Sequence, residues 1–192
     1  RAWIRLYQST LEESWLQKAD DLMQIALEQF FDPNTETFFY TAHDAQKLVS
    51  RSRELADNVI PAANSVLAED LFLLGTYWDR EDYRRKSSRL TQKMLPQALE
   101  NSPYFSYWGM LMLHHAYPPY EVAIVGENAE NLRMEMAQEF LPQVLWLGGK
   151  AEGKVPLLEH KLVPEITRIY VCQDKICKFP VETAEEALSQ LN

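Results

Sequence analysis

The densest group of polar residues lies between Asp57 and Ser65, directly before an apolar, helix-like run. This segment holds one aspartate, two asparagines, a serine and the rigid Pro61. A helix N-terminus offers free N–H groups and a partial positive charge, which suit an anion or a sugar hydroxyl. The same residue types also satisfy local backbone groups as caps. The segment therefore predicts either a binding site or a capped helix.

A histidine and further carboxylates precede this segment in a polar loop. A histidine in such a loop can act as a general base or contact a sugar, which makes His43 a candidate. A pair of carboxylates working as in glycosidases could be drawn from Asp44, Glu54 and Asp57. We therefore predict His43, Asp44 and Asp57 as catalytic candidates. The candidate binding residues are the neighbouring polar side chains Tyr40, Asn58, Asn64 and Ser65.

Cys172 and Cys177 have four residues between them, across a predicted turn. A zinc site needs four ligands, and His160 is the one histidine in this part of the chain. A redox motif has two intervening residues at a helix start. We expect a reduced, structural pair on two strands of a hairpin, without metal; a redox pair and a disulfide across the turn are the alternatives.

A nucleotide site at Gly126 is not expected. This glycine follows a strand and precedes a helix, but the chain has neither G-x-G-x-x-G nor P-loop spacing there. The carboxylate of Glu127 would also repel a phosphate. We predict no cofactor.

The charge balance limits the partners. The 192 residues carry 19 Lys+Arg against 28 Asp+Glu, a formal net charge of −9, which argues against nucleic acid and anionic membranes. No apolar run approaches the about 20 residues of a membrane span. Residues 1–7 lack the apolar region of a signal peptide, so we expect a cytoplasmic, globular protein.

The first two thirds of the chain predict helices. Apolar spacing indicates a helix over 11–30, with a capping box of Thr10 and Glu13. A short β-excursion or ordered loop, which includes Leu48-Val49, follows over 37–53. The further helices predicted are 64–78 with Asn64 as N-cap, 79–96 interrupted at Pro96, and 102–115 with Ser102 as N-cap.

The pattern changes after Pro119. Strands are predicted at 121–126, 144–147, 169–172 and 176–179, with helices over 129–140 and 182–191, the second capped by Thr183 and Glu186. Strand–helix–strand over about 30 residues is a βαβ unit, so the first two strands should be parallel. We expect two domains, 1–118 and 119–192.

A repeat links two helical pairs. A shift of 68 residues places Glu13 on Glu81 and Trp15 on Tyr83. Repeated helical hairpins must stack on neighbours, a pattern that suits an α/α toroid with long loops at its mouth. A chance likeness between two amphipathic helices is the alternative.

Several motifs together resemble a known family. They are the run 38–44, the segment 57–61 with Asn64-Ser65, and Tyr170-Val171-Cys172 with Cys177 and Pro180. They resemble thioredoxin-domain-containing proteins, a family that includes the spermatogenesis-associated thioredoxin-like proteins and bacterial relatives. Ala62-Ala63 stand where that family has Ser-Gly, which puts a close ligand approach to the backbone in doubt.

The resemblance implies a thioredoxin-like domain, then an α/α toroid like that of N-acylglucosamine 2-epimerases and six-hairpin glycosidases, then a small α/β tail. This chain has no C-x-x-C and begins at Arg1, so we expect a C-terminal fragment, with a trimmed tag as the alternative. The fold class predicted is mainly α: a partial toroid followed by an α/β tail with a βαβ unit.

Two functions follow as hypotheses. The first is a toroid that binds or isomerises a carbohydrate at its mouth. The second is a non-catalytic scaffold or regulatory module for the thioredoxin-like domain. A partial toroid would leave Phe72 and Trp78 more exposed than core aromatics, so self-association of the fragment is also expected.

Overall fold

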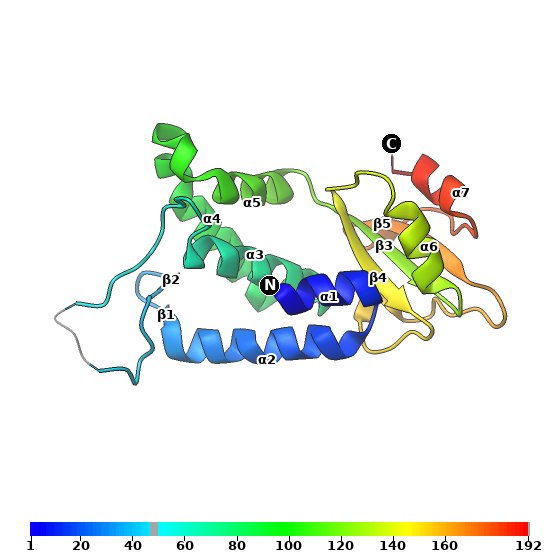
Figure 1. Ribbon diagram of the computed structural model, residues 1–192, viewed down its shortest axis with the longest axis horizontal. Coiled ribbons are helices and arrows are strands. Elements are labelled where there is room, and N and C mark those ends of the chain that lie inside the picture. Colours follow the sequence, from blue (N-terminus) through cyan, green and yellow to red (C-terminus); the bar gives the residue numbers. More distant parts are fainter. Residues whose placement is uncertain (47–49, 192) are drawn as a thin grey trace. The chain divides into compact units, whose positions relative to one another are not determined.

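The computed structural model describes residues 1–46 and 50–191, and it divides the chain into two compact units (Figure 1). The helical unit consists of Gln17–Ala116 together with Arg1. The sheet unit consists of Ala2–Leu16 and Tyr117–Asn192. The division falls inside one long helix, α2.

Seven α-helices are present in the described part of the chain, as labelled in Figure 1. They are α1 (Ala2–Thr10), α2 (Glu13–Phe30), α3 (Ala63–Tyr77), α4 (Glu81–Glu100), α5 (Ser106–Ala116), α6 (Ala129–Met136) and α7 (Ala184–Ser189). Two short 3₁₀ turns, Ser102–Tyr104 and Pro156–Leu158, complete the helical elements.

In the helical unit, α3 packs along α4 and α4 packs along α5. Helix α3 is apolar on most sides and buries most of its residues, as its sequence predicts. Trp108 of α5 and Leu90 of α4 are fully buried between these helices. Helix α4 instead has one apolar face, and its other faces carry charged residues.

The helix boundaries agree with the predicted repeat of 68 residues. Helix α2 begins at Glu13 and α4 begins at Glu81. Each follows a short break with a left-handed residue, Leu11 (φ 59°) in the first and Asp79 (φ 53°) in the second. The repeat therefore includes the backbone conformation of the break between paired helices, and not only the apolar spacing.

Several predicted helix ends are wrong, including the N-cap Ser102, because α5 begins only at Ser106. The Glu13 carboxylate does not close a capping box; it accepts hydrogen bonds from the backbone N–H groups of Lys154 and Val155, at 2.8–3.0 Å. Asn64 lies inside the first turn of α3, whose N-cap is Ala62. Helix α4 continues through Pro96 to Glu100.

A short antiparallel pair of strands follows α2. Strands β1 (Phe31–Asp32) and β2 (Thr37–Phe38) form a two-stranded sheet, which confirms a β-excursion at Phe38. The predicted extension through Leu48-Val49 lies outside the described residues.

The sheet unit is built on a four-stranded sheet in the order β4-β3-β5-β6 (Figure 1). Its strands are β3 (Tyr120–Val125), β4 (Val144–Gly149), β5 (Arg168–Gln173) and β6 (Ile176–Cys177). Strands β3 and β4 are parallel and joined through α6, so the βαβ unit is confirmed. Strand β5 is antiparallel to β3, and β6 is antiparallel to β5.

Alternate residues of these strands form the core of the sheet unit. Val122 and Ile124 of β3 belong to one apolar cluster with Leu132 and Met136 of α6, and with Ala187 of α7. Helix α7 begins with the predicted cap: the Thr183 Oγ1 accepts from the N–H of Glu186 at 3.3 Å. Helix α6 ends at Met136, four residues before the predicted end.

The two cysteines lie where the hairpin prediction puts them, Cys172 on β5 and Cys177 on β6. They form a disulfide, so the expectation of a reduced pair is wrong. The reason is register: the two residues are direct partners in the ladder, with a Cα–Cα distance of 3.9 Å.

The predicted fold class is wrong. The described residues are 49% helical and form sheets of two and four strands, so the fold is mixed α/β rather than a mainly α toroid. The strands after Pro119 form a full sheet with its own core, which is more than a tail on a helical ring. Phe72 is also only 8% exposed, because its ring packs against His114 and His115. Exposed apolar residues of the helical unit lie instead on α2, in the segment before α3 and on α4 and α5, among them Leu22, Ile25, Val59, Ile60, Leu99 and Leu113.

Candidate functional site

Asp57 is buried and joins the N-termini of two helices. Its Oδ1 accepts from the N–H of Ala62, the N-cap of α3, at 2.9 Å, and from the Ser65 Oγ at 2.7 Å. Its Oδ2 accepts from the N–H groups of Tyr107 at 2.9 Å and Trp108 at 3.4 Å, in the first turn of α5. A carboxylate there satisfies orphan N–H groups and faces the positive ends of two helix dipoles.

This geometry corrects one expectation. The sequence suggests that Asp57 comes too early to cap α3 and holds the Tyr40–Asp44 loop or faces a site. The segment between Asp57 and Ala62 instead folds back, so that the carboxylate reaches the first N–H of α3.

Asn64 and Ser65 are also occupied by the fold. The Asn64 side chain accepts from the Phe38 N–H at 2.7 Å and donates to the carbonyls of Phe38 and Glu54, both at 2.9 Å. Both residues are buried, at 1% and 0% exposed. Asn64 therefore fastens the strand β2 and the following loop to α3.

The other predicted site residues are exposed and lie apart from this network. Tyr40 is 66% exposed, and His43, Asp44 and Asn58 are also exposed. Over residues 1–46 and 50–191, no hydrogen bond joins the side chains of His43 or Asp44 to Asp57. The structure thus brings together Asp57 and Ser65 with Asn64 beside them, and it does not bring His43 or Asp44 to them.

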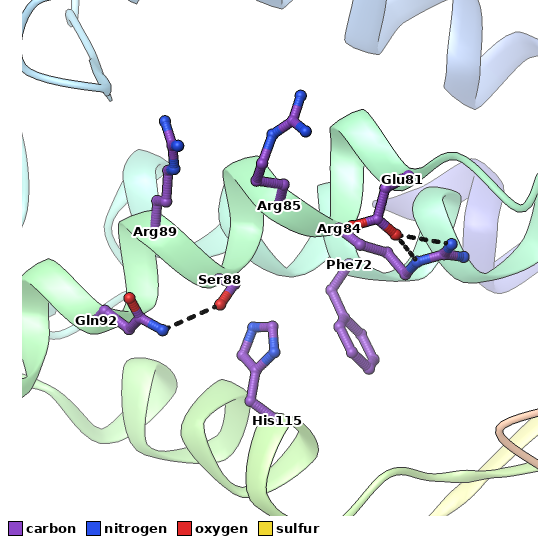
Figure 2. A pocket seen from close by; sticks show the side chains of 8 residues that line it. All are labelled: Phe72, Glu81, Arg84, Arg85, Ser88, Arg89, Gln92 and His115. Carbon is purple, nitrogen blue, oxygen red and sulfur yellow. Dashed lines mark hydrogen bonds and ion pairs between the residues drawn. The ribbon is translucent and has the colours of Figure 1, made fainter.

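A cavity of about 490 Å³ lies elsewhere in the helical unit, among α3, α4 and α5. Its lining residues are Phe72, Glu81, Arg84, Arg85, Ser88, Arg89, Gln92 and His115. Six of them come from one face of α4 because they recur at helical spacing. Figure 2 shows Arg85 and Arg89 on neighbouring turns of α4, with the ring of His115 facing Ser88.

The three arginines of this cavity differ in their partners. Arg84 is neutralised by Asp79 at 2.9 Å and Glu81 at 3.1 Å. Arg89 pairs with Glu36 at 2.6 Å. The guanidinium of Arg85 makes no hydrogen bond or ion pair with a described residue. The cavity wall therefore carries three arginines against one glutamate, and one arginine is available to a ligand.

His115 forms the opposite wall. Its ring lies edge-on to Phe72, with 5.1 Å between centroids, and its Nε2 lies 3.3 Å from the Ser87 Oγ. Burial, together with the neighbouring His114, lowers the pKa of His115 below its usual 6.5. The imidazole is therefore neutral at pH 7, so one ring nitrogen donates a hydrogen bond and the other accepts one.

The sequence analysis missed this cavity, although a signal was present. The charged and polar residues from Glu81 to Gln92 recur at spacings of three and four, but such a stripe is typical of a solvated helix face. Within the described residues no group of three or more His, Cys, Asp or Glu could hold a metal ion. None of the described helices is both long enough and apolar enough to cross a membrane.

Comparison with models of known protein families finds no match, and comparison with curated proteins finds none either. The resemblance to thioredoxin-domain-containing proteins therefore stays a prediction.

Proposed function

We propose that the chain is a binding module without a catalytic step, and that its ligand is a small anion bearing hydroxyl groups, such as a sugar phosphate or sugar acid. The single observation that carries this is the Arg85 guanidinium, which has no partner among the described residues and lies on the same face of α4 as Arg89 in the lining of the 490 Å³ cavity. A guanidinium recognises phosphate or carboxylate oxygens in a bidentate manner. The excess of arginine is local, in a chain of net charge −9.

The remaining lining groups support hydroxyl recognition. Ser88 and Gln92 present a hydroxyl and a side-chain amide on the same helix as the arginines, and His115 presents a neutral imidazole that faces Ser88. The lining therefore combines arginine, which can bind an anionic group, with hydroxyl, amide and imidazole groups, which can form hydrogen bonds with a polyol.

The absence of catalysis in this proposal rests on the Asp57 network. Its carboxylate already accepts four hydrogen bonds from the fold, so no lone pair is directed at a substrate. We therefore place the proposed carbohydrate ligand in the arginine cavity and not at the Asp57 segment. A cytoplasmic location remains part of the proposal.

The test is titration calorimetry with glucose 6-phosphate, inorganic phosphate and glucose. We expect binding of glucose 6-phosphate, weaker binding of phosphate and none of glucose. Arg85→Gln should weaken binding about 10–100-fold, because a hydrogen bond to a charged group contributes about 1.5–3 kcal/mol.

Lys86→Gln is the matched control, since it removes one positive charge from the same helix but outside the cavity. It should change affinity less than about twofold, because the ammonium of Lys86 does not line the cavity and its effect on a ligand there is screened by salt. Equal affinities for Arg85→Gln and wild type, or no binding of either phosphate, would refute the proposal.

A second candidate is the scaffold or regulatory module for a thioredoxin-like domain. It is favoured by the exposed apolar side chains on α4 and α5, Leu95, Leu99, Met110 and Leu113. Size-exclusion chromatography with light scattering, run with Leu99→Glu beside wild type, tests it. Concentration-dependent association that the variant abolishes would support it, and a monomer at all concentrations would oppose self-association.

A further inference from the structure

The disulfide of the sheet unit joins an inner strand of the sheet to its edge strand. Cys172 belongs to β5, while Cys177 belongs to β6, an edge strand of two residues. The turn between them has two left-handed residues, Asp174 (φ 50°) and Lys175 (φ 66°), as in a type I′ hairpin. The apolar cluster of the unit includes neither cysteine.

The two cysteines differ in access. Cys172 is 1% exposed, whereas Cys177 is partly exposed. A cavity of about 360 Å³ opens beside the bond. It is lined by both cysteines and by Tyr120, Val171, Gln173, Asp174, Ile176 and Lys178. A thiol that enters this cavity therefore reaches the sulfur of Cys177 before that of Cys172.

Lys178 adds a positive charge to the same cavity. Its ammonium lies over the Tyr120 ring, 5.5 Å from the centroid, and donates to the carbonyl of Gln190. A cation in the lining of this cavity stabilises a thiolate that enters it.

We propose that Cys172–Cys177 is a redox-active disulfide that exchanges with dithiols. One thiolate of the dithiol attacks the Sγ of Cys177, the Cys172–Cys177 bond breaks, and Cys172 leaves as a thiolate that takes up a proton. The second thiol of the reductant then attacks the first sulfur of the reductant, which is bonded to Cys177 in the mixed disulfide. This step releases Cys177 as a thiol. The protein disulfide gains two electrons and two protons, and the dithiol is oxidised to a disulfide.

The position of the bond permits this exchange without unfolding. Strand β6 pairs with β5 through two residue pairs only, and the bond closes a short loop, so it restricts the unfolded chain less than a bond that closes a long loop. Reduction therefore changes the hairpin and leaves the core of the sheet unit in place. This inference is independent of the anion cavity, which belongs to the helical unit.

The first experiment follows reduction of wild type by dithiothreitol under native conditions, with alkylation and mass spectrometry to count thiols. Far-UV circular dichroism follows the fold, and urea-induced unfolding gives the global unfolding rate. We expect reduction at least about 100-fold faster than global unfolding, with the helix and strand signal retained. Reduction that occurs only as fast as unfolding would show a structural disulfide and overturn the proposal.

The second experiment uses matched single-cysteine variants and oxidised glutathione. Cys172→Ser leaves Cys177 alone, and Cys177→Ser leaves Cys172 alone. The mixed disulfide should form at least about tenfold faster on Cys177, because Cys172 is buried. Equal rates would overturn the assigned order of attack. A variant that loses its circular dichroism signal would indicate a bond needed for folding and would also overturn the proposal, as would a wild-type protein that stays fully reduced in an oxidising glutathione buffer.

Discussion

Replacement of Asp57 by alanine tests the central structural claim about the predicted site. The carboxylate accepts four hydrogen bonds at 2.7–3.4 Å and is 2% exposed. Asp57→Ala removes both oxygens and leaves N–H groups at the start of α3 and α5 without partners in a buried place. Water cannot easily replace the carboxylate, so the lost contacts are not regained by solvation.

The magnitude follows from the two caps. Loss of a capping side chain costs about 0.5–2 kcal/mol for each helix, and buried donors left unsatisfied cost about 1–3 kcal/mol. For two caps that share one carboxylate we expect the free energy of unfolding to fall by about 3–5 kcal/mol. In a protein of this size that corresponds to a decrease in Tm of about 6–20 °C.

The assay is urea and thermal unfolding, followed by far-UV circular dichroism and by tryptophan fluorescence, to which Trp108 contributes. Asp57→Asn keeps one acceptor oxygen and should lose less than Asp57→Ala. Asp44→Ala is the matched control, because this predicted site residue is an exposed aspartate. Its unfolding free energy should stay within about 0.5 kcal/mol of wild type.

The reasoning would be refuted by a loss below about 1 kcal/mol in Asp57→Ala. Such a result would mean that the two helix starts do not depend on this carboxylate. It would also reopen Asp57 as a residue free to act on a ligand.

Three further predictions concern stability. Asn64→Ala removes three hydrogen bonds from a buried side chain and should lower the unfolding free energy by about 2–4 kcal/mol, measured by urea unfolding. Because burial lowers the pKa of His115, the unfolded chain binds protons at higher pH than the folded one. The contribution of this residue to stability should therefore be complete above the unfolded pKa of 6.5 and fall as pH drops below it, and His115→Gln should flatten this slope below about pH 6.5. Gly148 has φ 141°, and a Cβ there would lie 1.9 Å from a carbonyl oxygen of β3, so Gly148→Ala should lower the unfolding free energy by about 3 kcal/mol or prevent folding. Gly109→Ala in α5 is the control, because a Cβ there meets nothing within 4 Å; it should raise the unfolding free energy by about 0.4–1 kcal/mol in thermal unfolding.

The sheet unit was predicted well because its signals are local. The apolar run of β3, the Gly126 that ends it and the Thr183 cap of α7 each act within a few residues. Parallel pairing of β3 and β4 then follows from the length of the connection alone, since a crossover helix leaves few alternatives. Such features need no knowledge of distant partners.

The contacts of the helical unit were not predictable in the same way. Asp57 accepts from Tyr107, which is 50 residues further along the chain, and Asn64 bonds to Phe38, 26 residues before it. A sequence indicates that a buried polar residue needs a hydrogen-bond partner, but it does not indicate which distant backbone group is that partner. The asparagine therefore suggested an N-cap, whereas tertiary structure used it to fasten a strand.

The toroid prediction failed at a different step. The repeat itself has a structural counterpart, since Leu11 and Asp79 adopt the same left-handed conformation before helices that begin 68 residues apart. Two helical pairs with one kind of break do not by themselves define a ring. A closed ring requires further hairpins to cover both ends, and in this chain a four-stranded sheet follows instead.

The overall amino-acid composition does not predict the arginine cavity. A net charge of −9 directs attention to carboxylates, and the predicted catalytic residues were two acids and a histidine. Acidic side chains that cap helices or pair with arginines already have partners within the fold, however. Asp57 accepts hydrogen bonds from backbone N–H groups, and Glu36 forms an ion pair with Arg89. A group that remains available is then a base without an ion pair to any described residue, such as Arg85 on α4. In a chain with many acidic residues, a basic side chain that forms no ion pair is therefore informative about a binding site. Only the tertiary structure identifies such a side chain.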